Sequence, residues 1–125
     1  MRLLLDSHVV LWALAWPERL REITRSALAS PENEIFVSSA TLWELELKRA
    51  KGKLELPQNF AAVLREQDFG ELPVLWRHTQ AIHELPPIHA DPFDRLLLAQ
   101  TKEEGLTFVT GDGWCLQYPI ALMPA

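Results

Sequence analysis

Short apolar runs alternate with helical segments along this chain, and the alternation restricts the fold more than any other feature. The runs include Leu3–Leu5, Ile35–Val37 and Thr107–Thr110, each bounded by polar or turn-forming residues. Strands separated by helices favour a mostly parallel sheet that helices cover on both faces. Because 125 residues can bury one core but not two, we expect a single α/β domain over residues 1–125.

Proline, glycine and capping residues set the expected boundaries of the elements. The helix after Asp91 is the most clearly bounded, because Asp91 suits its N-cap, Pro92 its first position and Gly105 its end. Further helices are expected over residues 9–16, 17–30, 40–50, 60–67 and 78–84. Strands are expected over residues 3–5, 35–37, 73–75, 107–110 and 120–123.

The composition predicts an ordinary globular protein of the cytoplasm. Hydrophobic residues make up 48% of the chain and charged residues 23%. No apolar run approaches the roughly 18 residues of a membrane span, and no signal-peptide pattern opens the chain, so we expect no membrane partner. Cys115 is the only cysteine, which excludes an internal disulfide and predicts a small buried side chain.

The net charge of −5 argues against a nucleic-acid partner, since phosphate binding usually needs a basic face. A divalent cation bound by several of the acids would reverse this field locally. Four basic residues also cluster between positions 48 and 53. Such a cluster is usually a solvated face, with a phosphate contact as the alternative. These residues are Lys48, Arg49, Lys51 and Lys53.

Acidic residues stand where the expected strands end, at the edge where α/β sheets bind ligands. Asp6 directly follows the first strand, and Asp112 follows the strand at 107–110. Glu44 and Asp94 lie in helices that begin at the same edge, so the four carboxylates should converge. Uncompensated carboxylates repel, and an all-oxygen ligand set suits Mg²⁺ or Mn²⁺. Such ions promote in-line hydrolysis of phosphodiesters.

Each acid also has a simpler explanation. Asp6 could serve solely as the cap of the helix that follows it. Glu44 could form an ion pair with Lys48 at i,i+4. Asp112 could be a turn residue between two glycines. Asp91 is assigned to the helix cap rather than to metal binding, because Pro92 fixes the helix start.

The histidines and tryptophans give weaker evidence for a functional site than the acids do. His89 could touch substrate from its loop, but a loop histidine without a role is the simpler interpretation. His8 neighbours Asp6, yet a helical residue need not point the same way as its neighbour. The tryptophans are expected in the core more often than on a stacking surface, although one exposed at an interface would be an anchor. They are Trp12, Trp16, Trp43, Trp76 and Trp114.

Four motifs occur in order over nearly the whole chain: Asp6-Ser7-His8, Ser39 with Leu42-Trp43-Glu44, Asp91-Pro92-Phe93-Asp94-Arg95, and Val109-Thr110-Gly111-Asp112. Together they resemble the PIN-domain ribonucleases, and specifically the VapC-like toxins of type II toxin–antitoxin systems. The resemblance implies a three-layer α/β/α sandwich with a mostly parallel five-stranded sheet. It also implies an acidic Mg²⁺ or Mn²⁺ site, endonucleolytic cleavage of RNA, a homodimer and inhibition by a cognate antitoxin.

Carried over by position, the resemblance makes four acids both catalytic residues and metal ligands, with Asp91 as the alternate to Asp94. These acids are Asp6, Glu44, Asp94 and Asp112. Ser39 and Thr110 would support the site through hydroxyl hydrogen bonds. Arg95 could approach a phosphate, although an ion pair with a neighbouring acid is favoured.

The expected function is a metal-dependent endoribonuclease that acts as a toxin. The alternative is a noncatalytic PIN-like protein-binding domain that keeps the acids only as caps and surface pairs. A phosphatase-like hydrolase is a third hypothesis, but Ser7 and His8 occupy the places where a second aspartate would follow Asp6.

Overall fold

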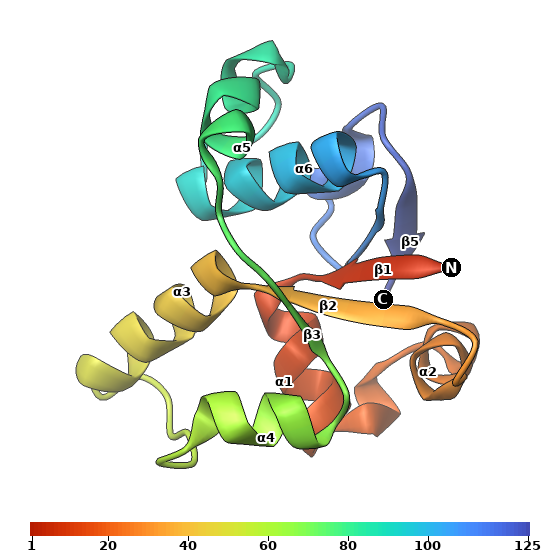
Figure 1. Cartoon of the computed structure of the whole chain (residues 1–125), viewed down its shortest axis with the longest axis vertical. Helices are drawn as coiled ribbons and strands as arrows, with labels where there is room; N and C mark the ends of the chain where they lie inside the picture. The colour runs from red at the N-terminus through yellow and green to blue at the C-terminus, as the bar shows by residue number, and fades with distance from the viewer.

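Five parallel strands form one sheet in the order β3-β2-β1-β4-β5, in a computed structural model that describes all 125 residues (Figure 1). The chain builds β2 and β3 on one side of β1, then crosses over to build β4 and β5 on the other. In such a sheet the crevice for ligands opens at the carboxyl ends of the two strands where the order reverses, here β1 and β4. The strands are β1 (Arg2–Leu5), β2 (Glu34–Ser38), β3 (Gly70–Leu72), β4 (Thr107–Thr110) and β5 (Leu122–Pro124).

Helices cover both faces of the sheet (Figure 1). The helices are α1 (Ser7–Ala15), α2 (Glu22–Ala29), α3 (Ser39–Ala50), α4 (Phe60–Glu66), α5 (Trp76–Ala81) and α6 (Pro92–Glu104). Three short 3-10 helices are η1 (Pro17–Arg19), η2 (Ile82–Glu84) and η3 (Cys115–Gln117). Helices α1, α2 and α4 lie on one side of the sheet and α5 and α6 on the other, while α3 leads outward from the end of β2 (Figure 1). The expected α/β/α sandwich is confirmed.

The central strand shows why the sheet is covered twice. Successive side chains of a strand point to opposite faces, and Leu3, Leu4 and Leu5 are all fully buried. Leu3 and Leu5 belong to the core that contains α1 and α4, whereas Leu4 belongs to the core beneath α5 and α6. An apolar run without alternation therefore marks a strand with helices on both sides.

Two expected strands are displaced. The third strand is Gly70–Leu72 rather than 73–75, and it pairs with Phe36–Ser38 of β2. Gly70 lies against Phe36, where a Cβ would stand 3.0 Å from the ring, so the strand depends on a residue without a side chain. The last strand is Leu122–Pro124 rather than 120–123.

Two expected helices are shorter than their sequence periodicity indicates. The segment 17–30 divides into η1 and α2 because Leu20 and Arg21 are extended between them. The backbone N–H of Arg21 donates to the carbonyl of Ala125 at 2.7 Å, a contact that a continuous helix would exclude. The segment 78–84 is instead α5, which begins at Trp76, followed by η2.

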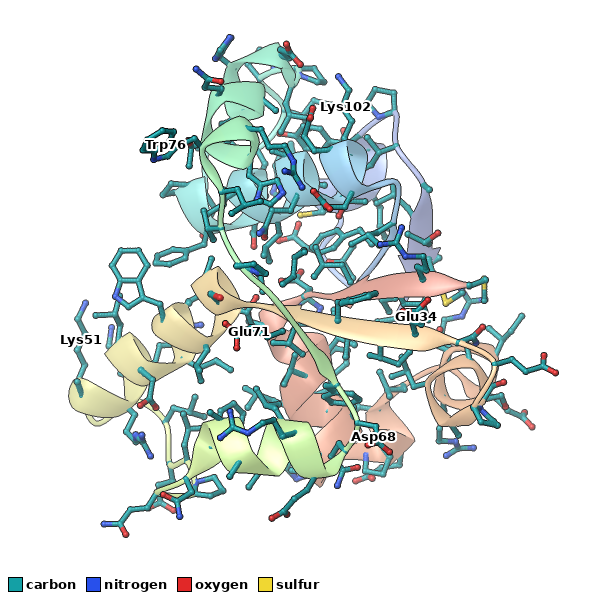
Figure 2. The ribbon with its side chains drawn as sticks, in the orientation of Figure 1. Glu34, Lys51, Asp68, Glu71, Trp76 and Lys102 are labelled. Atoms are coloured by element: carbon teal, nitrogen blue, oxygen red, sulfur yellow. The ribbon has the colours of Figure 1, made fainter.

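The tryptophans do not form the core. Trp16, Trp43 and Trp114 are about half exposed, and Trp76 is 89% exposed and projects from α5 (Figure 2). Trp12 is partly buried against the α1 core. The expectation of core tryptophans was therefore wrong, whereas Cys115 is fully buried as expected. No helix of the structure has both the length and the apolar character to cross a membrane.

Candidate metal centre

Asp6 stands at the junction of β1, α1 and β4. Its backbone N–H donates to the carbonyl of Val109 at 3.0 Å, which continues the pairing of β1 with β4 beyond the last strand residue. Its Oδ1 accepts the N–H of Ser7 at 2.8 Å and caps α1, while its Oδ2 accepts the hydroxyl of Thr110 at 2.6 Å. The side chain is nearly inaccessible, so Asp6 acts as a helix cap and also presents a carboxylate to the strand ends.

Asp112 is held by the same threonine. The hydroxyl of Thr110 accepts the N–H of Asp112 at 3.0 Å while it donates to Asp6. Asp112 Oδ1 in turn accepts the N–H of Trp114 at 2.8 Å and of Cys115 at 3.4 Å, where the chain turns into η3. Its Oδ2 takes no part in these bonds and lies 3.3 Å from Nε2 of His89.

Asp91 and Asp94 divide two roles at the start of α6. Asp91 Oδ1 accepts the N–H groups of Phe93 at 2.8 Å and Asp94 at 3.1 Å, so Asp91 is the N-cap. Asp94 is 9% exposed and makes no capping bond. Both side chains line the same cavity.

Glu44 reaches this edge from α3. Ser38 rather than Ser39 caps the helix, because Ser38 Oγ accepts the N–H of Ala40 at 3.1 Å. Ser39 donates its hydroxyl to the carbonyl of Leu72 at 3.4 Å and supports none of the acids. Glu44 Oε1 is buried without a hydrogen-bond partner, and no ion pair joins Glu44 to Lys48.

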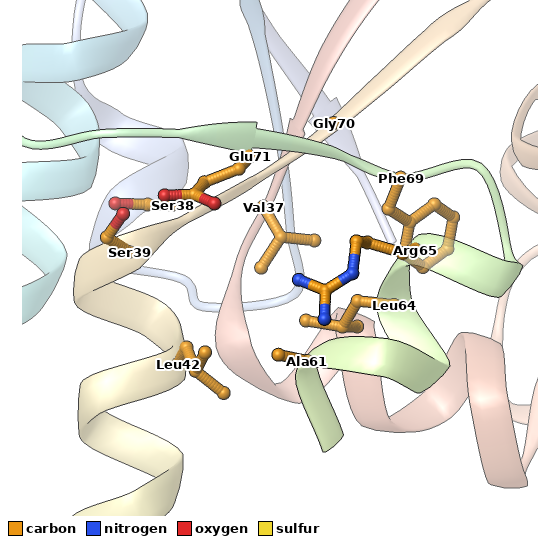
Figure 3. A pocket seen from close by; sticks show the side chains of 10 residues that line it. All are labelled: Val37, Ser38, Ser39, Leu42, Ala61, Leu64, Arg65, Phe69, Gly70 and Glu71. Carbon is orange, nitrogen blue, oxygen red and sulfur yellow. The ribbon is translucent and has the colours of Figure 1, made fainter. Parts of the chain in front are cut away.

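The acids converge on one cavity of about 220 Å³. Its lining residues are Asp6, Ser7, His8, Leu11, Glu44, Leu45, Lys48, Asp91, Asp94 and Asp112. A larger cavity of about 400 Å³ lies between α3 and α4 beneath β3 (Figure 3). It is mostly apolar, shares no lining residue with the acid cavity and offers no comparable set of titratable groups.

The electrostatics of the acid cavity favour a cation. Burial raises the pKa of Asp94 from 3.8 to about 7, and the charges of Asp6, Asp91 and Asp112 add to this effect. Burial disfavours the charged carboxylate of Asp94, and the neighbouring acids repel it further. A divalent cation would offset the repulsion between the acids, and the unpaired Glu44 Oε1 could coordinate it. Carboxylate oxygens are the donors that Mg²⁺ and Mn²⁺ prefer, so the residues fit these ions.

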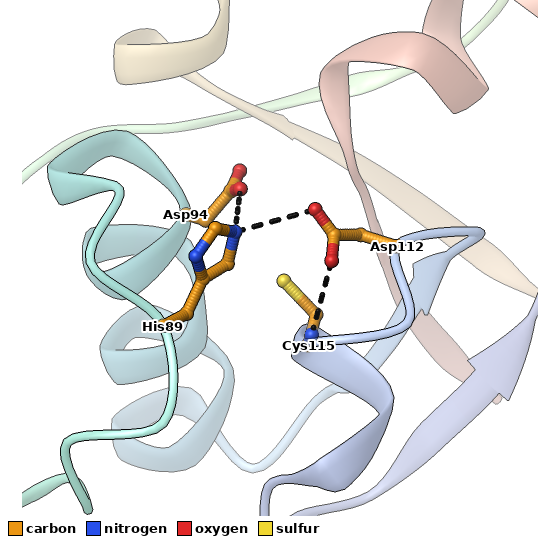
Figure 4. A group of neighbouring side chains, drawn as sticks. All are labelled: His89, Asp94, Asp112 and Cys115. Carbon is orange, nitrogen blue, oxygen red and sulfur yellow. Dashed lines mark hydrogen bonds and ion pairs between the residues drawn. The ribbon is translucent and has the colours of Figure 1, made fainter.

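His89 contacts two of the acids, which the sequence did not lead us to expect. Its Nε2 lies 2.9 Å from Asp94 Oδ2 and 3.3 Å from Asp112 Oδ2 (Figure 4). The ring partly offsets the acidic charge, since the proximity of His89 lowers the pKa of Asp94. Cys115 lies beside these residues (Figure 4), but burial and the nearby acids raise the pKa of its thiol, which keeps it protonated.

Arg95 positions the loop that carries His89. Its guanidinium donates to the carbonyls of Ile82 and Pro86 at 3.0 Å each and to the hydroxyl of Tyr118 at 3.2 Å. The Tyr118 hydroxyl also accepts the backbone N–H of His89 at 2.8 Å. Arg95 therefore makes no ion pair with an acid, contrary to the favoured interpretation, and its role is to fix the loop before α6.

His8 also joins the site. Its Nδ1 lies 3.4 Å from Asp6 Oδ2, and its Nε2 accepts the backbone N–H of Gly111 at 2.8 Å. The contact ties α1 to the turn after β4, and a Cβ at Gly111 would stand 3.2 Å from this ring nitrogen. The adjacency of His8 to Asp6 was the only signal of this contact in the sequence.

Comparisons with known proteins agree with this fold. The structure is similar to VapBC2 from Rickettsia felis bound to a promoter DNA fragment (16% identity, TM-score 0.74, covering 100% of this chain and 99% of that one). It is also similar to DNA-bound VapBC from Salmonella typhimurium (19% identity, TM-score 0.68, covering 99% and 98%). A third similar structure is FitAcB from Neisseria gonorrhoeae (22% identity, TM-score 0.61, covering 97% and 96%). Among curated proteins no sequence matches significantly. The family model for the PIN domain matches residues 3–114, and the chain therefore belongs to the PIN domain family.

Proposed function

We propose that this chain is a divalent-metal-dependent endoribonuclease that hydrolyses RNA phosphodiesters in the cytoplasm as the toxin of a toxin–antitoxin pair. The observation that carries the proposal is the convergence of acids from separate elements on one cavity, where Glu44 Oε1 is buried without a partner. Membership of the PIN family supports a nuclease. The likeness to VapBC and FitAcB structures supports a cognate antitoxin as partner, and we also propose a homodimer.

Four acids would hold Mg²⁺ or Mn²⁺, namely Asp6, Glu44, Asp94 and Asp112. When bound, the ion supplies charge stabilisation in the transition state and lowers the pKa of water to make it a nucleophile. Asp91, whose Oδ1 caps α6, remains the alternate to Asp94 as a ligand. The chain's own contribution is to fix its acids before the substrate arrives.

Thr110 and His89 hold the acids in position. The Thr110 hydroxyl sets the orientation of Asp6 and the position of Asp112 together, because it donates to one and accepts from the other. His89 Nε2 lies within 3.3 Å of both Asp94 and Asp112. Groups held in this way need not reorganise when charge develops on the phosphate, which lowers the barrier.

Cleavage of a labelled RNA in Mg²⁺ or Mn²⁺, compared with EDTA, tests the proposal. Asp6→Asn should lower the rate by at least about a hundredfold, because the amide keeps the helix cap but loses the anionic ligand. Asp68→Asn is the matched control. Asp68 lies after α4 with φ at 60°, a conformation that Asn also adopts, and it is remote from the cavity. Full activity of Asp6→Asn would refute the assigned role.

The alternative function is a noncatalytic protein-binding domain. Asp6 and Asp91 do cap helices, as that hypothesis requires. Capping and pairing do not account for a Glu44 oxygen that is buried without a partner in a cavity lined by four aspartates, and this combination favours the metal site. Titration calorimetry with Mn²⁺ separates the two, because a binding module without a metal site gives no saturable heat that Asp6→Asn abolishes.

A further inference from the structure

Two lysines follow Glu44 along one face of helix α3, in the direction that leads out of the acid cavity. Glu44, Lys48 and Lys51 are spaced at i, i+4 and i+7, so they share one face of the helix. With about 1.5 Å of rise per residue, Lys48 lies about 6 Å and Lys51 about 10 Å beyond Glu44 along the axis. Lys48 lines the cavity itself, and Lys51 lies at the outer end of α3 (Figure 2).

The basic cluster of α3 divides into two kinds of residue. Arg49 is engaged within the fold, because its guanidinium pairs with Glu46 and donates to the carbonyls of Leu56 and Pro57. Lys48, Lys51 and Lys53 are exposed and belong to none of the ion pairs in the structure, and Lys53 lies beyond the end of α3, after Gly52. Lys48 therefore remains free at the mouth of a cavity lined by acids. A bound cation would neutralise those acids and leave this ammonium group without any counter-charge from the protein.

We infer that Lys48 and Lys51 bind successive backbone phosphates of a single-stranded RNA as it leaves the acid cavity along α3. The inference rests on the proposed function and names the path of its substrate. Lysine binds phosphate as a point charge without demanding a fixed geometry, which suits a mobile backbone.

The recessed position of the acids favours a single strand over a duplex. Asp6 is 1% exposed and Asp94 9%, so a scissile phosphate has to enter the cavity to approach them. A single strand bends readily, whereas a duplex is stiff over many base pairs and keeps its phosphates on a regular helix. The spacing of the two lysines along one helix face then guides the strand outward.

The salt dependence of RNA binding tests the inference. A fluorescein-labelled oligouridylate is titrated with protein in Ca²⁺ instead of Mg²⁺, its integrity is checked on a gel, and anisotropy gives the affinity at several salt concentrations. Each phosphate contact on a single strand contributes about 0.7 to the slope of log K against log salt. Lys48→Met should therefore reduce the slope by about 0.7, and the double variant with Lys51→Met by about 1.4.

Lys102→Met is the matched control, because Lys102 is an exposed lysine near the end of α6 away from Asp94 (Figure 2). Its loss should leave the slope unchanged. Oligouridylates with one neutral methylphosphonate identify the contact. At the phosphate bound by Lys48, the neutral linkage should weaken wild-type binding and make Lys48→Met equal to wild type.

An unchanged slope in Lys48→Met, or an equal fall in Lys102→Met, overturns the inference, since Lys48 would then contribute only general charge. That result leaves the proposed function intact if the wild-type chain still cleaves RNA and binds Mn²⁺. Failure of the wild-type chain to bind RNA overturns both, and calorimetry with Mn²⁺ then shows whether the metal site survives.

Discussion

At the residue scale, the acids and the hydroxyl of Thr110 were predictable, whereas the contacts of His8 and His89 with the acids were not. Asp6, Glu44, Asp94 and Asp112 follow from the rule that parallel strands end at one edge, and all four line one cavity. The contacts of His89 were not predicted, because its position depends on a loop held by Arg95 and Tyr118. Tyr118 is distant from His89 in sequence, and the sequence left the role of Arg95 open. A side chain on irregular backbone has no periodicity from which to predict its direction.

Asp94 gives a prediction about stability and pH in the absence of divalent metal. Its pKa rises from 3.8 unfolded to about 7 folded, so the folded state holds this proton more tightly. The resulting stabilisation is fully present below about pH 4 and is lost as pH rises through 7. The loss is on the order of 2–4 kcal/mol, at about 1.4 kcal/mol per pKa unit with allowance for partial exposure.

Asp94→Asn removes this titration because the amide stays neutral. In EDTA, its free energy of unfolding should exceed that of the wild type at pH 8, and this difference should shrink steadily as the pH falls towards about 4. Urea unfolding followed by circular dichroism measures both. A variant less stable than wild type at pH 8 would contradict the prediction and would mean that Asp94 is adequately compensated by His89.

At the element scale, strong periodicity and capping predicted the central elements, and short or peripheral ones were misplaced. Helix α6 begins and ends where Asp91, Pro92 and Gly105 indicate, and β1 lies where the apolar run stands. Strand β3 has only three residues, so its position is decided by pairing with β2 and by the fit of Gly70 against Phe36. Tertiary contacts of this kind leave little trace in a local pattern.

Gly70→Ala tests this view of β3. The added Cβ would stand 3.0 Å from the Phe36 ring, so either the ring or the edge strand has to move. We expect a loss of about 1–3 kcal/mol in the free energy of unfolding, as for other overpacked sites. Gly113→Ala is the control, because a Cβ there meets nothing within 4 Å and its φ is not positive. Equal stability of the two variants would show that β3 tolerates displacement.

At the scale of the whole molecule, the strand order places the first and fourth strands side by side and concentrates charge at their ends. The sequence predicted the layers, because repeated strand–helix alternation has few solutions. The sequence did not predict which large apolar side chains remain exposed to solvent. The exposed Trp43, Trp76 and Trp114 show that apolar content alone does not assign a residue to the core.

Divalent metal should stabilise the folded chain as a whole. A ligand that binds only the native state adds about 2.7 kcal/mol at a concentration a hundredfold above its Kd, which corresponds to a rise in Tm of roughly 5–15 °C for a chain of this size. Thermal unfolding with Mn²⁺ and with EDTA measures the shift. Asp6→Asn should abolish it and Asp68→Asn should retain it. An equal shift in both variants would indicate nonspecific binding.

One hydroxyl, that of Thr110, joins an aspartate at position 6 to another at position 112. The orientation of the two acids thus depends on a contact between residues 104 positions apart in the sequence. Both carboxylates therefore reach their positions in the same folding event, the pairing of β4 with β1.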